Sequence, residues 1–194
     1  MTAVDTMLRI AAGDLNAVGA RWALIGGLAV GYRTEPRFTK DVDFAVAVAG
    51  QPEADGVVFR LRSRGYHPGQ IFEQDYVEQT STVRLVSTRG RSDVIVDLLF
   101  ASSGIENEIV AAAGLVEVFP RLRVPVATIG HLIAMKALAD RGQDRTDLGY
   151  LIPAASGADL AQAREAVQLI KKRGFSRESD VVANLEHYIK QAGR

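Results

Sequence analysis

Residues 41–48 alternate without a break between two kinds of side chain. The even-numbered positions are large and apolar, and the odd-numbered positions are aspartate or alanine. Because residues two apart in a strand point to the same side, this segment is predicted to be a half-buried strand with Asp41 and Asp43 on one face. Such residues are about 6.6 Å apart along the strand. The two carboxylates can therefore converge on one ligand.

The rest of the first two thirds of the chain mixes helical and strand patterns. Apolar residues at helical spacing predict a first helix that ends near Gly19, a helix over residues 51–64 and a short helix over residues 105–113. Apolar runs predict further strands at residues 22–25, 82–87, 93–100, 116–119 and 123–126. The turn signal at residues 88–90 predicts that the strands on either side of it form a hairpin.

The pattern becomes wholly helical from Thr128 onward, a residue type that caps helices. A helix is predicted over residues 129–140, followed by three further helical stretches, with Gly142, Gly157 and Gly174 as helix ends. No repeat or low-complexity linker separates the two parts. We therefore expect a core of residues 1–127 and a helical subdomain of residues 128–194 that packs on it.

The charge balance and the lack of cysteine exclude several kinds of site. With 23 basic and 23 acidic side chains, the chain has no global attraction for polyanions, so any nucleic-acid site is a local patch. Without cysteine, disulfides and thiolate metal sites are excluded. No apolar run approaches the roughly 18 residues needed to span a bilayer, and no signal peptide is evident. A cytoplasmic protein without a membrane segment is expected.

The spacing of Asp41 and Asp43 suits a pair of divalent cations. Two such ions, roughly 3.5–4 Å apart, can activate a hydroxyl and neutralise a leaving pyrophosphate, and they prefer carboxylate ligands. Asp97 is the best candidate for a third carboxylate, because an ionised aspartate within an apolar run is costly unless it is paired or bound to metal. Asp93 is the alternative third carboxylate. An ordinary solvent-facing strand surface would also explain the pair.

Other residues near this strand suit the binding of phosphate. Gly26 and Gly27 follow an apolar strand and precede a helix-like segment, where glycines allow close approach to a phosphate. Taken alone, they indicate a tight turn. Arg33, Arg37 and Lys40 would crowd the approach to the carboxylates and could hold a polyphosphate, or they could lie on a solvated loop.

Lys136 lies in an apolar helical segment, where a lysine must either reach the surface or meet an anion. Asp140, four residues later, would be the simple helical partner. Two groups of basic residues could contact an RNA backbone or could simply be soluble helix faces. These groups are Arg60, Arg62 and Arg64, and Lys171, Lys172 and Arg173.

Several of these motifs together resemble the DNA-polymerase-beta-like nucleotidyltransferase superfamily, and within it most closely the AbiEii and MenT group of toxin nucleotidyltransferases. The matching runs are residues 24–30, residues 37–44, residues 132–137, Arg141 and residues 144–148. The superfamily more often has Gly-Ser where this chain has Gly-Gly. The resemblance implies an α/β (α+β) fold, with a polymerase-beta-like core, a mixed sheet and a helical C-terminal part.

The resemblance also implies roles for individual residues. They are Gly26, Gly27 and Thr39 at the triphosphate, Asp41 and Asp43 on magnesium, Lys136 on the nucleotide phosphates and Asp147 in a downstream acidic motif. Whether Asp144 or Asp147 fills that motif is open. In the mechanism that we expect, Asp97 orients the acceptor hydroxyl and Lys136 stabilises charge on the leaving pyrophosphate.

The function implied is that of a toxin that transfers a nucleoside monophosphate, from a pyrimidine NTP, to the 3′ end of tRNA. Such transfer blocks aminoacylation and hence translation. Two Mg²⁺ ions would assist, and a cognate antitoxin protein would restrain the toxin. The alternatives are transfer to a small molecule such as an aminoglycoside, AMP transfer to a protein hydroxyl, and a non-catalytic, antitoxin-like module that binds nucleotide.

Overall fold

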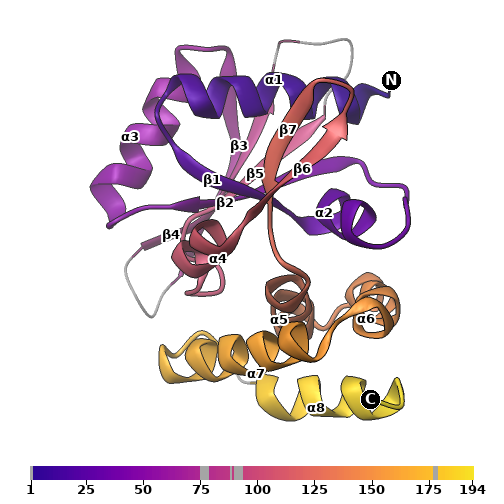
Figure 1. Ribbon diagram of the computed structural model, residues 1–194. Helices are drawn as coiled ribbons and strands as arrows, with labels where there is room; N and C mark the ends of the chain where they lie inside the picture. Colours follow the sequence, from indigo (N-terminus) through magenta and orange to yellow (C-terminus); the bar gives the residue numbers. More distant parts are fainter. Residues whose placement is uncertain (1, 75–78, 88, 90–93, 177–178) are drawn as a thin grey trace.

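Seven strands in the described part of the chain form one sheet, in the spatial order β3-β4-β5-β2-β1-β7-β6 (Figure 1). The computed structural model describes residues 2–74, 79–87, 89, 94–176 and 179–194. The strands are β1 (Arg21–Ile25), β2 (Asp41–Ala47), β3 (Tyr66–Gln74), β4 (Gln79–Ser87), β5 (Ile95–Leu99), β6 (Gly114–Phe119) and β7 (Leu122–Val126). Central β2 is antiparallel to β1 and parallel to β5. The predicted α/β (α+β) class with a mixed sheet is confirmed.

Helices cover both faces of the sheet. They are α1 (Ala3–Ala17), α2 (Gly26–Arg33), α3 (Gln51–Arg62), α4 (Glu106–Ala112), α5 (Ile129–Ala139), α6 (Gly142–Ala154), α7 (Gly157–Lys172) and α8 (Val181–Gln191). Figure 1 shows α1 and α3 on one side, α2 and α4 on the other, and α5 to α8 gathered beyond α2 and α4. Within the described residues, none of the helices is long and apolar enough to cross a membrane.

The face of β2 that carries Phe44 is the face that α1 covers. Trp22 on β1 and Phe44 on β2 are buried and meet edge to face, with ring centroids 5.1 Å apart. The indole Nε1 of Trp22 donates a hydrogen bond to Asn16 Oδ1 on α1, at 2.9 Å. Because side chains alternate along a strand, burying Phe44 on this face places Asp41 and Asp43 on the opposite one.

β2 is more deeply buried than the alternation predicts. All its side chains from Phe44 to Ala47 are buried, and only Asp41 and Asp43 are half-buried. The prediction of a half-buried strand is therefore wrong. The reason is that α4 packs on β2, and the alanines at alternate positions leave room for a helix.

The outer strands β3 and β4 differ from the sequence prediction. β3 is not predicted, because Pro68 and Gly69 interrupt its pattern, and proline is tolerated there because β3 is an edge strand. β4 begins at Gln79, three residues before the predicted start. Its antiparallel pairing with β5 confirms the predicted hairpin. Apart from Arg89, the predicted turn at residues 88–90 lies outside the described residues.

The C-terminal helices begin where polar residues cap them. Thr128 Oγ1 accepts a hydrogen bond from the His131 N–H at 3.3 Å, which confirms the predicted cap of α5. Gly142 and Gly157 are the first residues of α6 and α7, so their predicted role as helix ends is wrong. The residue before each of these glycines is the N-cap of the next helix. Gly174 does follow the end of α7, with a φ of 82°.

α5 joins the two parts of the chain. It packs against α2 on the sheet side and against α6, α7 and α8 on the other side. Most of its side chains are therefore buried, including that of Lys136. The division into residues 1–127 and residues 128–194 stays a prediction.

Candidate active site

Three carboxylates share one face of the sheet because of the register between β2 and β5. Asp41 and Asp43 lie two residues apart on β2, and Asp97 on β5 is the direct register partner of Asp43. Adjacent strands are about 4.8 Å apart, so the three side chains are close neighbours. The structure thus places Asp97 beside the pair as predicted, while its role as a metal ligand stays a prediction. Asp93, the alternative, lies outside the described residues.

Asp43 bears the electrostatic consequence of this crowding. Burial raises the pKa of its carboxyl, and the neighbouring carboxylates of Asp97 and Asp41 raise it further, while Lys136 and Arg141 lower it, so that the pKa is about 7. A bound cation would favour the ionised form. The site is therefore arranged so that a cation relieves the repulsion among its carboxylates.

Arg84 on β4 neutralises Asp97 from the other side. The two residues are register partners, and Arg84 donates hydrogen bonds from Nε to Asp97 Oδ1 at 3.0 Å and from Nη2 to Oδ2 at 2.8 Å. A two-pronged contact of this kind fixes the carboxylate plane. The sequence analysis missed Arg84. Its signal was an arginine within an apolar strand of the hairpin that also carries Asp97.

Gly26 allows the start of α2 to approach Asp43 closely. Its φ is 65°, and a Cβ at this position would overlap the Asp43 carboxylate. A Cβ at Gly27 would likewise meet the guanidinium of Arg37. The first N–H groups of a helix have no partner within the helix and favour anions. This arrangement suits the predicted contact with a triphosphate, which stays a prediction.

Lys136 is buried between two carboxylates of α6. Its Nζ lies 2.8 Å from Asp144 Oδ1 and 2.8 Å from Asp147 Oδ2. Lys136 therefore meets an anion, which is one of the two outcomes expected for it. The prediction that Asp140 is its partner is wrong, because Asp140 forms an ion pair with Arg145 instead. The turn between α5 and α6 directs Asp140 away from the site and brings the first turns of α6 toward it.

Two arginines extend this network. The Nε of Arg37 lies 2.8 Å from Asp147 Oδ1, and its Nη2 donates to Asp147 Oδ2 at 3.0 Å. Arg141 Nε donates to Asp144 Oδ2 at 2.7 Å. Burial alone would raise the pKa of Asp144, but hydrogen bonds from Arg141 and Lys136 hold it below its usual value. Asp144 and Asp147 thus each form ion pairs with two basic side chains. The choice between them for the downstream motif stays open.

The remaining predicted residues lie around this centre. Thr39 Oγ1 lies 3.5 Å from the backbone nitrogen of Asp41, next to the carboxylate pair. Lys40 is exposed. Arg33 does not reach the site, because its Nε and Nη2 donate to two backbone carbonyls at and just after the end of β7, at 2.9 and 2.7 Å. Both predictions for Arg33, a phosphate contact and a solvated loop, are wrong.

One arginine of each of the two groups of basic residues forms an ion pair within the protein. Arg64 forms an ion pair with Asp14 on α1, and Arg173 forms one with Glu108 on α4. A contact of these two groups with RNA stays a prediction.

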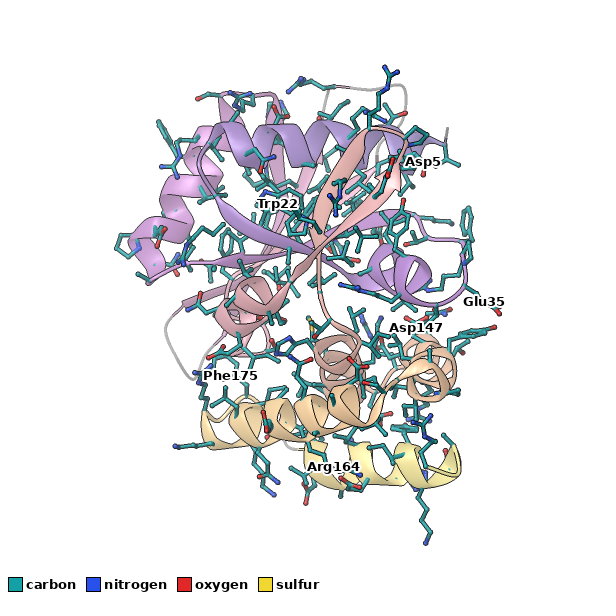
Figure 2. The ribbon with its side chains drawn as sticks, in the orientation of Figure 1. Asp5, Trp22, Glu35, Asp147, Arg164 and Phe175 are labelled. Atoms are coloured by element: carbon teal, nitrogen blue, oxygen red, sulfur yellow. The ribbon has the colours of Figure 1, made fainter. Side chains whose placement is uncertain are left out.

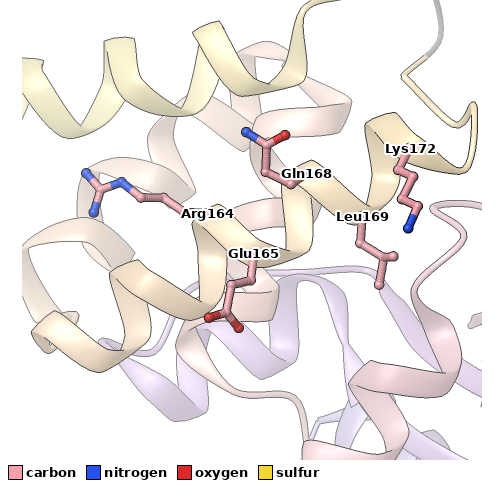
Figure 3. A pocket seen from close by; sticks show the side chains of 5 residues that line it. All are labelled: Arg164, Glu165, Gln168, Leu169 and Lys172. Atoms are coloured by element: carbon pink, nitrogen blue, oxygen red, sulfur yellow. The ribbon is translucent and has the colours of Figure 1, made fainter.

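A separate open groove of about 570 Å³ lies along α7 (Figure 3). It is lined by Arg164, Glu165, Gln168, Leu169 and Lys172. It has no carboxylate from β2 or β5 in its lining, so it is distinct from the carboxylate centre.

The carboxylate chemistry suits a hard divalent cation. In the part of the chain that the structure describes, no three histidine, cysteine, aspartate or glutamate side chains are already arranged to hold a metal ion. With Asp97 bound by Arg84, the half-buried Asp41 and Asp43 remain to receive one. Burial and the neighbouring carboxylates raise the pKa of Asp43, and crowded oxygen donors of this kind fit Mg²⁺ or a similar ion.

Comparison with known proteins identifies the family. The sequence pattern of the family described as "Nucleotidyl transferase AbiEii toxin, Type IV TA system" matches residues 10–187, which is most of the chain. The chain belongs to the AbiEii family of nucleotidyl transferase toxins. Membership confirms the resemblance inferred from the sequence motifs, and it implies an NTP substrate and an antitoxin partner for this AbiEii-family chain.

Solved structures show the same fold. A nucleotidyltransferase-like antigenic protein from Paracoccidioides brasiliensis is 15% identical, with 98% of this chain and 89% of that chain covered and a TM-score of 0.54. The antibiotic-resistance factor ANT(2'')-Ia is 14% identical, with 97% and 92% covered and a TM-score of 0.51. No curated protein matched the AbiEii-family chain. At these identities the likeness shows the fold alone.

Replacing Gly26 with alanine tests the close approach of α2 to Asp43 in the AbiEii-family site. The positive φ and the overlap with the carboxylate would force Asp43 to move. Because a displacement of about 1 Å can lower a rate roughly 10²-fold, we expect nucleotidyl transfer to fall by that order. Gly149→Ala on α6 is the matched control, since its Cβ would meet nothing within 4 Å. Equal transfer by both variants would contradict the proposed role of Gly26.

Proposed function

We propose that this AbiEii-family chain transfers a nucleoside monophosphate from a pyrimidine NTP to the 3′ end of tRNA, in the cytoplasm, and so blocks aminoacylation and translation. The observation that supports transfer is the arrangement of Asp41, Asp43 and Asp97 on one face of the sheet, with Gly26 at the start of α2 and Lys136 facing the same centre. The tRNA acceptor and the preference for pyrimidines rest on the resemblance to the toxin group.

Each residue of the centre has a part in this proposal. Asp41 and Asp43 would hold two Mg²⁺ ions, which when bound supply a Lewis acid for the phosphates. Asp97, oriented by Arg84, accepts a hydrogen bond from the acceptor hydroxyl and aligns it for attack. Lys136 already lowers the pKa of Asp43 across the site, so its positive charge can also stabilise charge on the leaving pyrophosphate.

The chain also offers groups to hold the triphosphate. The first amides of α2, at Gly26 and Gly27, are oriented for an anion. Thr39 lies beside the carboxylate pair, and Arg37 and Lys40 bring positive charge to the same loop. These contacts position the nucleotide, which lowers the barrier by holding the reacting atoms in place.

Labelled NTPs and total tRNA test this function directly. We expect label from a pyrimidine NTP to appear on tRNA in the presence of Mg²⁺, and to disappear with EDTA or in the variant Asp41→Ala. Asp55→Asn, which changes an exposed carboxylate on α3, serves as the control and should transfer normally. Absence of label on tRNA, or transfer undiminished by Asp41→Ala, would refute the proposal.

The same experiment separates the alternatives. Label on an added aminoglycoside but not on tRNA would favour a small-molecule acceptor. The fold relative ANT(2'')-Ia is described as an antibiotic-resistance factor. Label on protein would favour AMP transfer to a hydroxyl. NTP binding without any transfer would favour a non-catalytic module.

A further inference from the structure

An exposed phenylalanine lies at the edge of the candidate active site. The ring of Phe38 is 80% exposed, and it belongs to the loop that leads from α2 into β2, three residues before Asp41. Leaving a large apolar side chain in water forgoes the stabilisation that burial would bring. Because this loop leads to the carboxylate pair, a ligand bound there could cover the ring.

The contacts of Arg37 hold Phe38 in place. Arg37 Nη1 donates to the backbone carbonyl of Phe38 at 3.0 Å, and its Nη2 donates to Asp147 Oδ2 on α6 at 3.0 Å. The same guanidinium lies against Gly27 at the start of α2. One side chain thus ties the backbone at Phe38 to α6 and to the predicted phosphate contact.

A second exposed ring lies on α6, the helix that carries the Asp147 partner of Arg37. Tyr150 is 47% exposed and follows Asp147 by three residues on α6. Residues three apart are neighbours on a helix surface. In Figure 2 the loop, marked by Glu35, and α6, marked by Asp147, lie on the same side of the molecule, as the bond between Arg37 and Asp147 requires.

Exposed aromatic rings with basic side chains beside them are typical of sites that bind nucleotides. Bases stack on exposed aromatic side chains, and neighbouring arginines and lysines contact the phosphates. Here Arg37 and Lys40 flank Phe38 within the same four residues of sequence. A docking protein would also cover apolar rings. Phe38 lies three residues before Asp41, however, and its backbone is held by the arginine that pairs with Asp147, which favours a ligand of the reaction centre.

We propose that Phe38, with Tyr150 as a second ring, is a stacking platform for a nucleobase at the active site. The proposal rests on the proposed nucleotidyl transfer, because it assigns the ring to a substrate of that reaction. The stacked base belongs either to the incoming NTP or to the terminal nucleotide of the acceptor RNA. Both have the same chemistry, so the experiment has one arm for each.

The fluorescence of a base analogue that stacking quenches measures stacking without requiring transfer. The two ligands are pyrrolocytidine triphosphate, a fluorescent pyrimidine NTP, and a short single-stranded RNA with 2-aminopurine at its 3′ end, each added with Mg²⁺. We expect quenching by the wild type in at least one arm and an affinity roughly 5- to 100-fold lower in Phe38→Ala, the range for loss of one stacking contact. Tyr150→Ala should weaken the same arm.

Two control variants should bind like the wild type. Phe38→Tyr keeps a ring, and Phe59→Ala removes an equally large ring that is 70% exposed on α3. Phe38→Tyr should stay within about twofold of the wild type because the base can still stack on its ring. Phe59→Ala should stay within the same range, as is usual for surface changes without a specific contact. The arm that loses affinity in Phe38→Ala identifies the stacked base.

The outcomes separate this proposal from the proposed function. If Phe38→Ala binds both ligands like the wild type, or if the wild type quenches neither, the stacking platform is refuted. If tRNA is not labelled in the transfer assay but quenching is seen and is lost in Phe38→Ala, the transfer function is refuted and the platform stands.

Discussion

Asp43→Asn is expected to abolish nucleotidyl transfer and at the same time to raise the melting temperature of the metal-free protein. Transfer should fall by roughly 10³-fold or more, because a metal ligand contributes several kcal/mol of charge stabilisation in the transition state. Stability should rise because asparagine removes a carboxylate whose ionised form is disfavoured by burial and by the charges of Asp97 and Asp41. A gain in stability at the cost of activity is the usual trade-off when a destabilised active site is altered.

The pH dependence of stability follows from the raised pKa of Asp43. This pKa is about 7 in the folded protein and about 3.9 in an unfolded chain. Between these values the folded protein binds more protons, so the stability that Asp43 contributes falls as the pH rises through this window and is lowest above about pH 7. The difference in melting temperature between Asp43→Asn and the wild type should therefore grow from about pH 5 to about pH 8.

Thermal unfolding in EDTA, together with the labelled transfer assay, measures both effects. We expect Asp43→Asn to melt roughly 2–6 °C above the wild type at about pH 8, on a scale of about 2–4 °C per kcal/mol. Asp55→Asn on α3 is again the control and should change neither quantity, since its carboxylate is exposed. A lower melting temperature for Asp43→Asn at this pH would contradict the account of crowded carboxylates.

Lys136→Met should have the largest effect on stability. Methionine fills the space of the lysine side chain, but Asp144 and Asp147 stay buried and each loses its ion pair with Lys136. Removing one partner of a buried ion pair costs about 3–5 kcal/mol, which corresponds to a melting temperature lower by roughly 6–20 °C. Transfer should also be lost, because the positive charge that faces Asp43 is gone.

A second substitution separates charge from packing in this prediction. The double variant Lys136→Met with Asp144→Asn removes one buried carboxylate along with the lysine, so it should regain part of the stability. Lys190→Met on α8 changes an exposed lysine and should alter stability by less than about 0.5 kcal/mol. If Lys136→Met is as stable as the wild type, the buried network does not support the fold as described.

The sequence by itself determined the features that depend on local periodicity. The alternation at residues 41–48 was enough to place Asp41 and Asp43 on one face, because side chains on any strand alternate. The helix after Thr128 and the pairing of β4 with β5 also followed from caps and apolar runs. The family motifs at residues 24–30, 37–44, 132–137, 141 and 144–148 were enough to indicate the AbiEii group from the sequence, and the family match confirms it.

Only the tertiary structure decided which distant residues meet. The register that sets Asp97 beside Asp43 depends on how β2 and β5, which are far apart in the chain, pack side by side. The hairpin of β4 and β5 was predicted, but only its register in the structure sets Arg84 beside Asp97. The same holds for Lys136, whose partners lie on α6 because the turn between α5 and α6 carries Asp140 away. Local patterns specify which way a side chain points from its own element, whereas its partners depend on the packing of the elements against one another.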